Sequence, residues 1–218
     1  MARPWEWDAD LRRYRAPNGR FIGQKQMLEQ RDRFQDAVKQ ELVGLGQKVA
    51  NGEITVQQYV TQGRDIIKSA HVDMYALSVG GRNSMTASDW GKVGAETKKQ
   101  YGYWQGFAED IAQGDMTEAG IMNRAGLYGN ALVSSYSKGS HSAAKKADLD
   151  EQRNVLGGND AHCDACLEET DKGWVSVNDN DFSQPGEREC GPNCHCSVEF
   201  RTRPSDEGGD SEGDEGDD

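Results

Sequence analysis

The first 162 residues contain no cysteine, and the 218-residue chain has no apolar run near the roughly 20 residues that a membrane-spanning helix needs. Charged residues interrupt the apolar side chains between Arg3 and Asp8, so we expect no secretory signal segment at the amino terminus. These absences favour a protein that folds in a cytoplasm, where thiols stay reduced, and that has no membrane partner.

The sequence also lacks the common catalytic motifs. It has no glycine-rich phosphate loop, no G-x-S-x-G turn and no H-E-x-x-H pair. The usual signatures of nucleotide-binding proteins, serine hydrolases and metalloproteases are therefore missing. A zinc deaminase carries a proline directly before its C-x-x-C pair, whereas His162 precedes Cys163 here. We therefore expect neither an enzyme nor a small-molecule substrate.

All the cysteines lie near the carboxyl end, in two short hooks. The first hook is a C-x-x-C pair and the second is the run CGPNCHC, and together they contain Cys163, Cys166, Cys190, Cys194 and Cys196. Two such hooks can direct thiolates at one point and complete a tetrahedron around zinc. The alternative is a pair of disulfides, which an odd number of cysteines leaves incomplete and which a reducing compartment disfavours.

We therefore predict one zinc ion held by four of the five cysteines. With four thiolates bound, no coordination position remains for a substrate or an activated water, so the zinc should be structural. The pattern leaves open which of Cys190, Cys194 and Cys196 is not a ligand.

The acidity of the chain is concentrated in a tail. The formal net charge is −12, and Ser205–Asp218 contributes eight acidic residues and no basic one. Without these residues the chain has 29 acidic residues (37 less 8) against 25 basic ones, which argues against a dominant DNA-binding face. We expect residues 204–218 to be disordered, because they have almost no apolar area to bury.

Apolar residues recur at steps of three and four over four stretches, which predicts four helices between residues 24 and 136. Asn51-Gly52, Gly80-Gly81 and Gly114 end the first three stretches, and threonines precede the later ones as caps. The fold class is therefore mainly α, a helical bundle or an extended helical body. The fourth helix should fade at Ser137–Ser140.

We divide the chain into an N-terminal arm with a hairpin (1–23), a helical body (24–147), a cysteine-rich C-terminal knob (148–203) and an acidic tail (204–218). His71 is expected to be a surface or satisfied core histidine rather than a metal ligand, and His141 to lie in a mobile serine-rich stretch. Four glycines of the third helix either permit close helix packing or lower its stability: Gly91, Gly94, Gly102 and Gly106.

Several of these motifs occur in one order: a hairpin with GRFI, the sequences GGR and DWGKVG in the body, the C-x-x-C pair, Pro185-Gly186, and the second hook. In this order the chain resembles the minor head or head morphogenesis proteins of tailed bacteriophages, such as the Mu-like minor head protein, as far as about Arg203. Many relatives place a histidine just before a closing Asn-Cys-Arg-Cys type sequence, which is NCHC (193–196) here, and this chain has Cys190 in the place of that histidine. The resemblance implies a non-enzymatic virion protein of the capsid interior, made in the host cytoplasm. It would contact the portal or major capsid protein and act in head assembly or DNA ejection.

A zinc-ribbon-type adaptor that binds nucleic acid or another protein is the alternative. Such a module would need basic residues around the hooks to hold nucleic acid. The neighbourhood instead carries acidic residues, so we expect little direct contact with packaged DNA: Asp160, Asp164, Glu168, Glu169, Asp171, Glu187 and Glu189.

Overall fold

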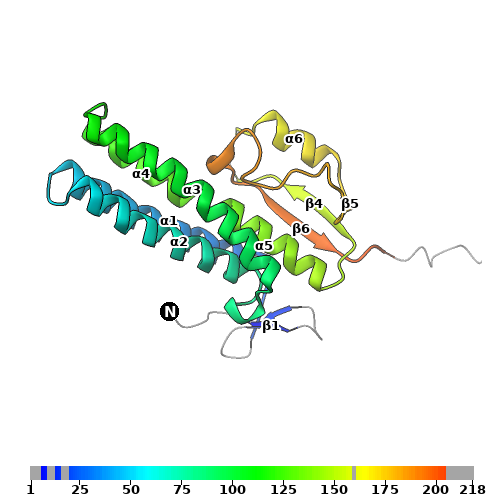
Figure 1. The fold of residues 1–218 in the computed structure, drawn as a ribbon. Helices are drawn as coiled ribbons and strands as arrows, with labels where there is room; N and C mark the ends of the chain where they lie inside the picture. The colour runs from blue at the N-terminus through cyan, green and yellow to red at the C-terminus, as the bar shows by residue number, and fades with distance from the viewer. Residues whose placement is uncertain (1–5, 9–12, 16–19, 159–160, 205–218) are drawn as a thin grey trace, which may run out of the picture.

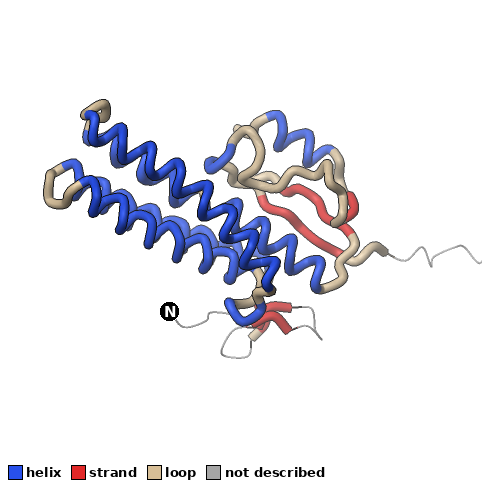
Figure 2. Tube along the Cα trace, in the orientation of Figure 1, coloured by secondary structure: helices blue, strands red, loops and turns tan. Residues whose placement is uncertain are grey.

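The computed structural model describes residues 6–8, 13–15, 20–158 and 161–204 of the chain. This part of the protein is mainly helical, as the sequence predicts, and a smaller unit with a sheet lies against the helices (Figure 2). No helix among the described residues is long and apolar enough to cross a membrane. The predicted disorder of the acidic tail falls on residues outside the described ranges.

Five α-helices build the helical body: α1 (Gln24–Ala50), α2 (Val56–Ser78), α3 (Ala87–Gln113), α4 (Glu118–Asn130) and α5 (Leu132–Lys146). A 3-10 turn, η1 (Arg82–Ser84), precedes α3. Only Ala131 separates α4 from α5, so the two helices together take the place of the predicted fourth helix. Helix α1 packs on α2 and α4, and α2 packs on α3 and α5 (Figure 1).

Threonines begin three of these helices. Thr55, Thr86 and Thr117 each accept a hydrogen bond from a backbone N–H in the first turn, which satisfies a donor that the helix itself leaves free. Helix α3 ends at Gly114, whose φ of 78° lies in the left-handed region that glycine adopts without strain. The predicted helix starts and stops are therefore confirmed at these positions.

An aromatic cluster forms the centre of the helical body. Trp104 is fully buried, stacks on Tyr59 with 4.5 Å between ring centroids, and meets Phe107 and Tyr128 edge to face. Gly63 lies against this indole, and a Cβ there would come within 2.1 Å of the Trp104 ring. The absence of a side chain at Gly63 is thus required for α2 and α3 to pack as they do.

A fully buried carboxylate lies near the start of α3. Asp89 accepts hydrogen bonds from the Tyr75 hydroxyl (2.7 Å), the Ser142 hydroxyl (2.5 Å) and the Thr86 backbone N–H (2.8 Å). It also forms an ion pair of 2.6 Å with Lys146. Burial by itself would raise the pKa of Asp89, but these donors outweigh it and hold the pKa well below its usual range.

Helix α5 continues to Lys146, so the prediction that helix fades at Ser137–Ser140 is wrong. The small residues of this stretch are packing residues. A Cβ at Gly139 would come within 1.9 Å of the Ser78 hydroxyl oxygen, and Ser135 hydrogen-bonds to Nδ1 of His71 at 2.7 Å. Small side chains therefore let α5 approach α2 closely instead of loosening the helix.

The predictions for the two histidines of the helical body differ in how well they agree with the structure. His71 is a buried core residue, as predicted, but only its Nδ1 is hydrogen-bonded, and its buried Nε2 has no partner among the described residues. His141 was expected in a mobile stretch, but it lies on α5, where its Nε2 is 2.7 Å from the carbonyl oxygen of Val177 and its ring stacks on Phe200. It therefore helps to hold the C-terminal knob against the helical body.

The four glycines noted on α3 do not allow close packing. Open space surrounds the position that a Cβ would take at Gly91, Gly94, Gly102 and Gly106. Of the two interpretations left open, only a loss of helix stability is compatible with this placement.

The C-terminal knob contains a three-stranded antiparallel sheet in the order β5-β4-β6. Strand β4 (Glu151–Val155) is central, and β5 (Val175–Ser176) and β6 (Ser197–Arg201) flank it. Helix α6 (Asp164–Asp171) packs on β4, and α5 packs on β6 and on a 3-10 turn, η2 (Gly191–Asn193) (Figure 1). The knob is thereby placed on the side of the bundle formed by α4 and α5.

The N-terminal arm forms a second small antiparallel sheet of β1 (Glu6–Asp8), β2 (Arg13–Arg15) and β3 (Phe21–Ile22). Tyr14 pairs with Ile22, which confirms the predicted hairpin, although its turn at 16–19 lies outside the described residues. Whether its aromatic side chains fold back on the body also lies outside the described part.

Candidate metal centre

Helix α6 and the turn η2 position the cysteines of the two hooks. Cys163 is the N-cap of α6, and Cys166 lies in the first turn of that helix, where its N–H bonds to the Cys163 carbonyl at 2.9 Å. Cys190 and Cys194 flank η2, and Cys196 directly precedes β6. Each hook is thus a tight turn that brings neighbouring cysteines to one side of the backbone.

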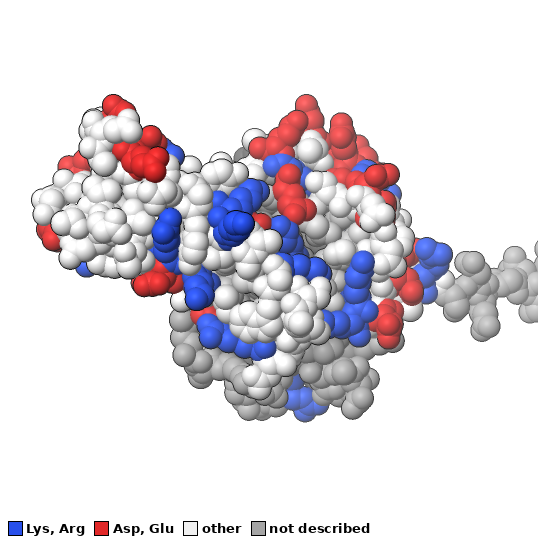
Figure 3. All heavy atoms as spheres, viewed as in Figure 1, with Lys and Arg blue, Asp and Glu red and all other residues white. Residues whose placement is uncertain are grey.

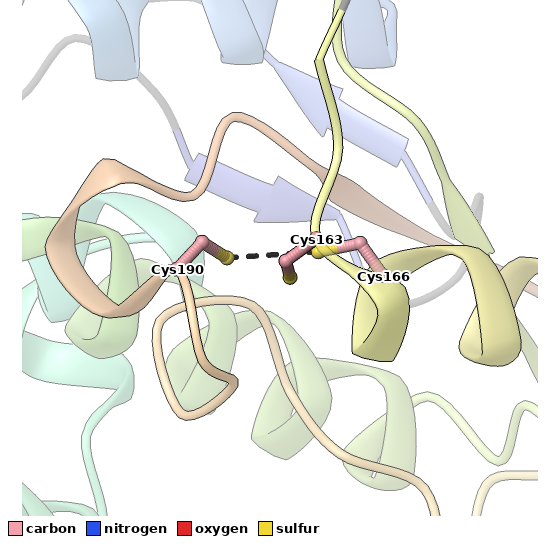
Figure 4. Close-up of side chains that lie close together, drawn as sticks. All are labelled: Cys163, Cys166 and Cys190. Carbon is pink, nitrogen blue, oxygen red and sulfur yellow. Dashed lines mark hydrogen bonds between the residues drawn. The ribbon is translucent and has the colours of Figure 1, made fainter.

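The structure brings all five predicted cysteines together, and all are free thiols. The sulfur of Cys166 lies 3.6 Å from that of Cys190, the pair joined by the dashed line in Figure 4, and 3.9 Å from that of Cys194. A tetrahedron of sulfurs with the usual zinc–sulfur bond length has an edge of roughly 3.8 Å. The spacing of these thiols therefore fits a tetrahedral metal ion, and the cluster can hold one.

Two groups of three cysteines satisfy the spacing of metal ligands. Cys163, Cys166 and Cys190 form the first group, and Cys166, Cys194 and Cys196 form the second, with all sulfurs of a group within 4.8 Å of one another. Cys166 belongs to both. A tetrahedral ion with four thiolate ligands would have to draw on both groups, and four ligands among the five cysteines stays a prediction.

The centre is largely enclosed. Cys166, Cys194 and Cys196 are buried, and they pack against Val133 of α5 together with Leu156 of the knob. Cys163 and Cys190 are half-buried. The site therefore lies where the knob meets the helical body, and a bound ion would fix both hooks next to α5.

Burial raises the pKa of Cys163, but hydrogen bonds with Cys166 and Cys190 outweigh it and lower that pKa. Three other thiols of the cluster resist ionisation without a cation. Burial raises the pKa of Cys190 to about 12, and contact with Cys194, followed by burial, raises the pKa of Cys196. Burial also raises the pKa of Cys166, against a hydrogen bond from Arg188 that lowers it. A metal ion deprotonates the thiols that it binds, and so supplies the positive charge that this enclosed cluster needs to ionise.

Arg188 and Asn154 support the first hook, and sequence reasoning missed both. Nη1 of Arg188 lies 3.6 Å from the sulfur of Cys166 and 2.8 Å from Oδ1 of Asn154. The amide of Asn154 in turn donates to the Cys166 carbonyl (3.1 Å) and to the Thr170 hydroxyl (2.8 Å). The sequence signal for Arg188 is its place two residues before Cys190, but nothing there indicates contact with the other hook.

Two glycines allow close backbone approach at the centre. A Cβ at Gly157 would come within 2.5 Å of the His195 carbonyl oxygen, so this glycine lets the chain cross the second hook. Gly186, with φ of 89°, lies against the backbone of Ser134 on α5, where a Cβ would come within 2.9 Å of the amide nitrogen. Pro185-Gly186 is one of the motifs on which the resemblance rests, and this contact gives Gly186 a physical role.

One side of the centre carries exposed acidic side chains, and on another side the charged side chains form ion pairs. Acidic side chains gather over α6 in Figure 3, where Asp164, Glu168 and Asp171 are exposed. Lys138 of α5 forms ion pairs with Glu96 (2.8 Å) and with Glu187 of the knob (3.1 Å). This acidic face does not favour nucleic acid as a ligand of the hooks.

Trp174, which lies between the hooks in sequence, packs within the knob. The guanidinium groups of Arg153 and Arg201 lie 4.7 and 4.1 Å from its ring centroid, close enough for cation–π contacts. Trp174 is half-buried and is held within the knob by these two arginines.

Comparison of the chain with protein-family models, with curated proteins and with solved structures finds no match. The fold and the cysteine cluster are accordingly the observations from which a function has to be argued.

Proposed function

We propose that the chain is a structural minor head protein of a tailed bacteriophage, with one zinc ion that locks the C-terminal knob onto the helical body. The observation that carries this proposal is the convergence of five free cysteines, three of them buried, at the contact between knob and α5. The order of motifs along the sequence supplies the link to phage head proteins.

The donor set supports zinc in a structural role. Thiolates at tetrahedral spacing are the ligands of structural zinc sites, and four of them leave no position for a water or a substrate. Zinc binding of this kind contributes directly to folding, on the order of 10 kcal/mol in small zinc domains. A knob with few large apolar side chains can be held by such a site.

A role in assembly agrees with the shape of the molecule. The helical body and the knob offer separate surfaces to neighbouring subunits, and we propose the portal or the major capsid protein as the partner, at the capsid interior. The zinc-ribbon adaptor for nucleic acid receives less support, because α6, which carries Cys166 of the first hook, has exposed acidic residues.

The metal is tested first. Protein purified under reducing conditions without chelator is measured by elemental analysis, and its thiols are titrated in denaturant. We expect one zinc per chain and five titratable thiols once the metal is removed. Absence of metal, with a single titratable thiol, would mean two disulfides and would overturn the metal centre.

The assembly role is tested in the phage that encodes the chain. An amber mutation in the gene is complemented with the wild-type chain or with the Cys166→Ser variant, and particles are examined by electron microscopy and protein analysis. We expect the protein in purified virions, and defective heads or non-infectious particles without it. Normal, infectious virions that lack the protein would refute a head function.

A further inference from the structure

Arg188 is a charged residue buried inside the C-terminal knob. Only 5% of it is exposed, and its side chain makes hydrogen bonds to neutral groups: both Nε (2.9 Å) and Nη2 (2.5 Å) donate to the Ser183 carbonyl, and Nη1 donates to Asn154. The Phe182 ring covers one side, 5.8 Å from the guanidinium carbon. The side chain is therefore fixed in place on several sides.

A guanidinium stays protonated in proteins, so this buried group carries a full positive charge. Burying a charge is costly unless an opposite charge lies beside it. Over the described ranges, no carboxylate forms an ion pair with Arg188, although the neighbouring Glu187 and buried Glu169 pair with lysines. Among the hydrogen-bond partners of Arg188, only the sulfur of Cys166 can become an anion.

Cys166 is also the cysteine that both groups of three share. A zinc ion with four thiolates has a net charge of −2, and that charge lies in a largely enclosed site. A cationic donor placed on the shared sulfur would offset part of this charge and fix the direction of the Cys166 side chain.

We propose that Arg188 is a positioning residue of the metal centre, which holds Cys166 as a thiolate ligand and compensates the negative charge of the metal–thiolate cluster. This inference rests on the metal centre of the proposed function. It assigns a role to a residue that belongs to neither cysteine hook, and it explains why a buried arginine lies in the knob without a carboxylate beside it.

The test uses the full-length chain with cobalt(II) as a spectroscopic substitute for zinc. Cobalt bound by thiolates shows a sulfur-to-metal charge-transfer band, whose energy depends on how strongly the sulfur holds its electrons. In Arg188→Gln we expect metal binding weaker by roughly 10- to 100-fold in competition with a chelator. The band should also shift to longer wavelength, because a thiolate without its cationic donor gives up electrons more easily.

Two further variants make the test specific. Arg153→Gln removes another arginine of the knob, one that contacts Glu199 and Trp174 but no cysteine, and it should leave affinity and band unchanged. Arg188→Lys keeps the charge and loses the fork of donors, so its affinity and band should fall between those of wild type and Arg188→Gln. If Arg188→Gln binds no metal at all, the charge-transfer band of Arg188→Lys is compared with that of wild type. A shift to longer wavelength supports the role of Arg188, and an unchanged band overturns it.

The outcomes separate the two proposals. A wild-type chain that binds neither cobalt nor zinc removes the metal centre and the role of Arg188 with it. A wild type with a thiolate–cobalt spectrum leaves the centre in place, and unchanged affinity and band in Arg188→Gln then overturn the role of Arg188 alone. Weaker binding without a shifted band would also overturn it, because a residue that only packs the knob would give that result.

Discussion

In the helical body the largest fully buried side chains are aromatic and aliphatic, whereas the buried residues of the C-terminal knob are chiefly cysteines and polar side chains. Trp104, Tyr59 and Phe107 represent the first group, and Gln152, Asn154 and Arg188 the second. Burial of large apolar side chains is the main source of folding free energy, so the body can fold through its own core. The knob has little of that source.

This difference indicates how each region is held. Polar side chains in the knob hydrogen-bond to one another, as Gln184 does to Gln152 and Arg188 does to Asn154. Such contacts specify a geometry but add little net stability, because the same groups bond water in the unfolded chain. Stability of the knob should therefore depend on the metal centre.

The largest effect should come from removing the shared ligand. Cys166→Ser is expected to lose the zinc, and with it binding free energy on the order of 10 kcal/mol, while the helices of the body stay folded. Limited proteolysis should then cut the knob first, and far-ultraviolet circular dichroism should change little.

A matched control for this variant is Leu167→Ser, which changes the adjacent residue of α6. Leu167 is 42% exposed, so this variant should keep its zinc and its resistance to protease. Collapse of the whole chain in Cys166→Ser would contradict the division into two differently stabilised regions.

The next effect concerns the body alone. Asp89→Asn removes the charge that pairs with Lys146 and leaves that lysine without its carboxylate. Lys146 is exposed, so the loss arises at the buried carboxylate, whose charge-assisted hydrogen bonds from Tyr75, Ser142 and the Thr86 backbone become weaker. We expect a cost of about 4 kcal/mol in urea denaturation monitored by circular dichroism. The exposed pair of Asp73 with Arg82 supplies the control, because Asp73→Asn should cost at most about 1 kcal/mol. Equal losses in the two variants would show that burial of Asp89 is irrelevant to its contribution.

A smaller effect is expected from filling the space between α2 and α3. Gly63→Ala places a methyl group against the Trp104 indole and should destabilise the body by about 3 kcal/mol in urea denaturation. Gly91→Ala changes a glycine of α3 with open space around it, and should stabilise the body by about 1 kcal/mol. A gain of stability in Gly63→Ala would mean that α2 and α3 are not packed as closely as described.

The helices and the cysteine cluster are predictable because their signals are local. A stripe of apolar residues defines each helix, a threonine cap starts it, and the spacing within each hook fixes which cysteines can meet. The extension of α5 was missed because serine and glycine are poor helix formers by themselves. They form helix here through contacts with α2 that only the folded chain supplies, such as Ser135 with His71.

The residues that support the metal centre could not be predicted from the sequence, because their roles also depend on tertiary contacts. Arg188 reaches Cys166 and Asn154 across gaps of 22 and 34 residues, and no periodicity links these positions. Gly157 and Gly186 are likewise explained only by the backbone that each of them meets. Residues that hold ligands in place depend on tertiary contacts, whereas the ligands themselves follow a short motif.

The smallest effect is a dependence of the body on pH. Burial lowers the pKa of His71 from 6.5 to about 4, a shift that nearby Glu96 opposes and Lys138 adds to. Below pH 6.5 the unfolded chain therefore binds a proton at His71 that the folded chain takes up only near pH 4. The contribution of neutral His71 to the free energy of unfolding is complete above pH 6.5 and is lost as the pH falls from 6.5 to 4. Between pH 8 and pH 5 the loss attributable to His71 should be about 2 kcal/mol, measured as the difference in urea stability between wild type and His71→Asn at both values. Acid release of the proposed zinc would affect both proteins alike and cancel in that comparison. An equal pH dependence in the two would therefore show that His71 is not held neutral by burial.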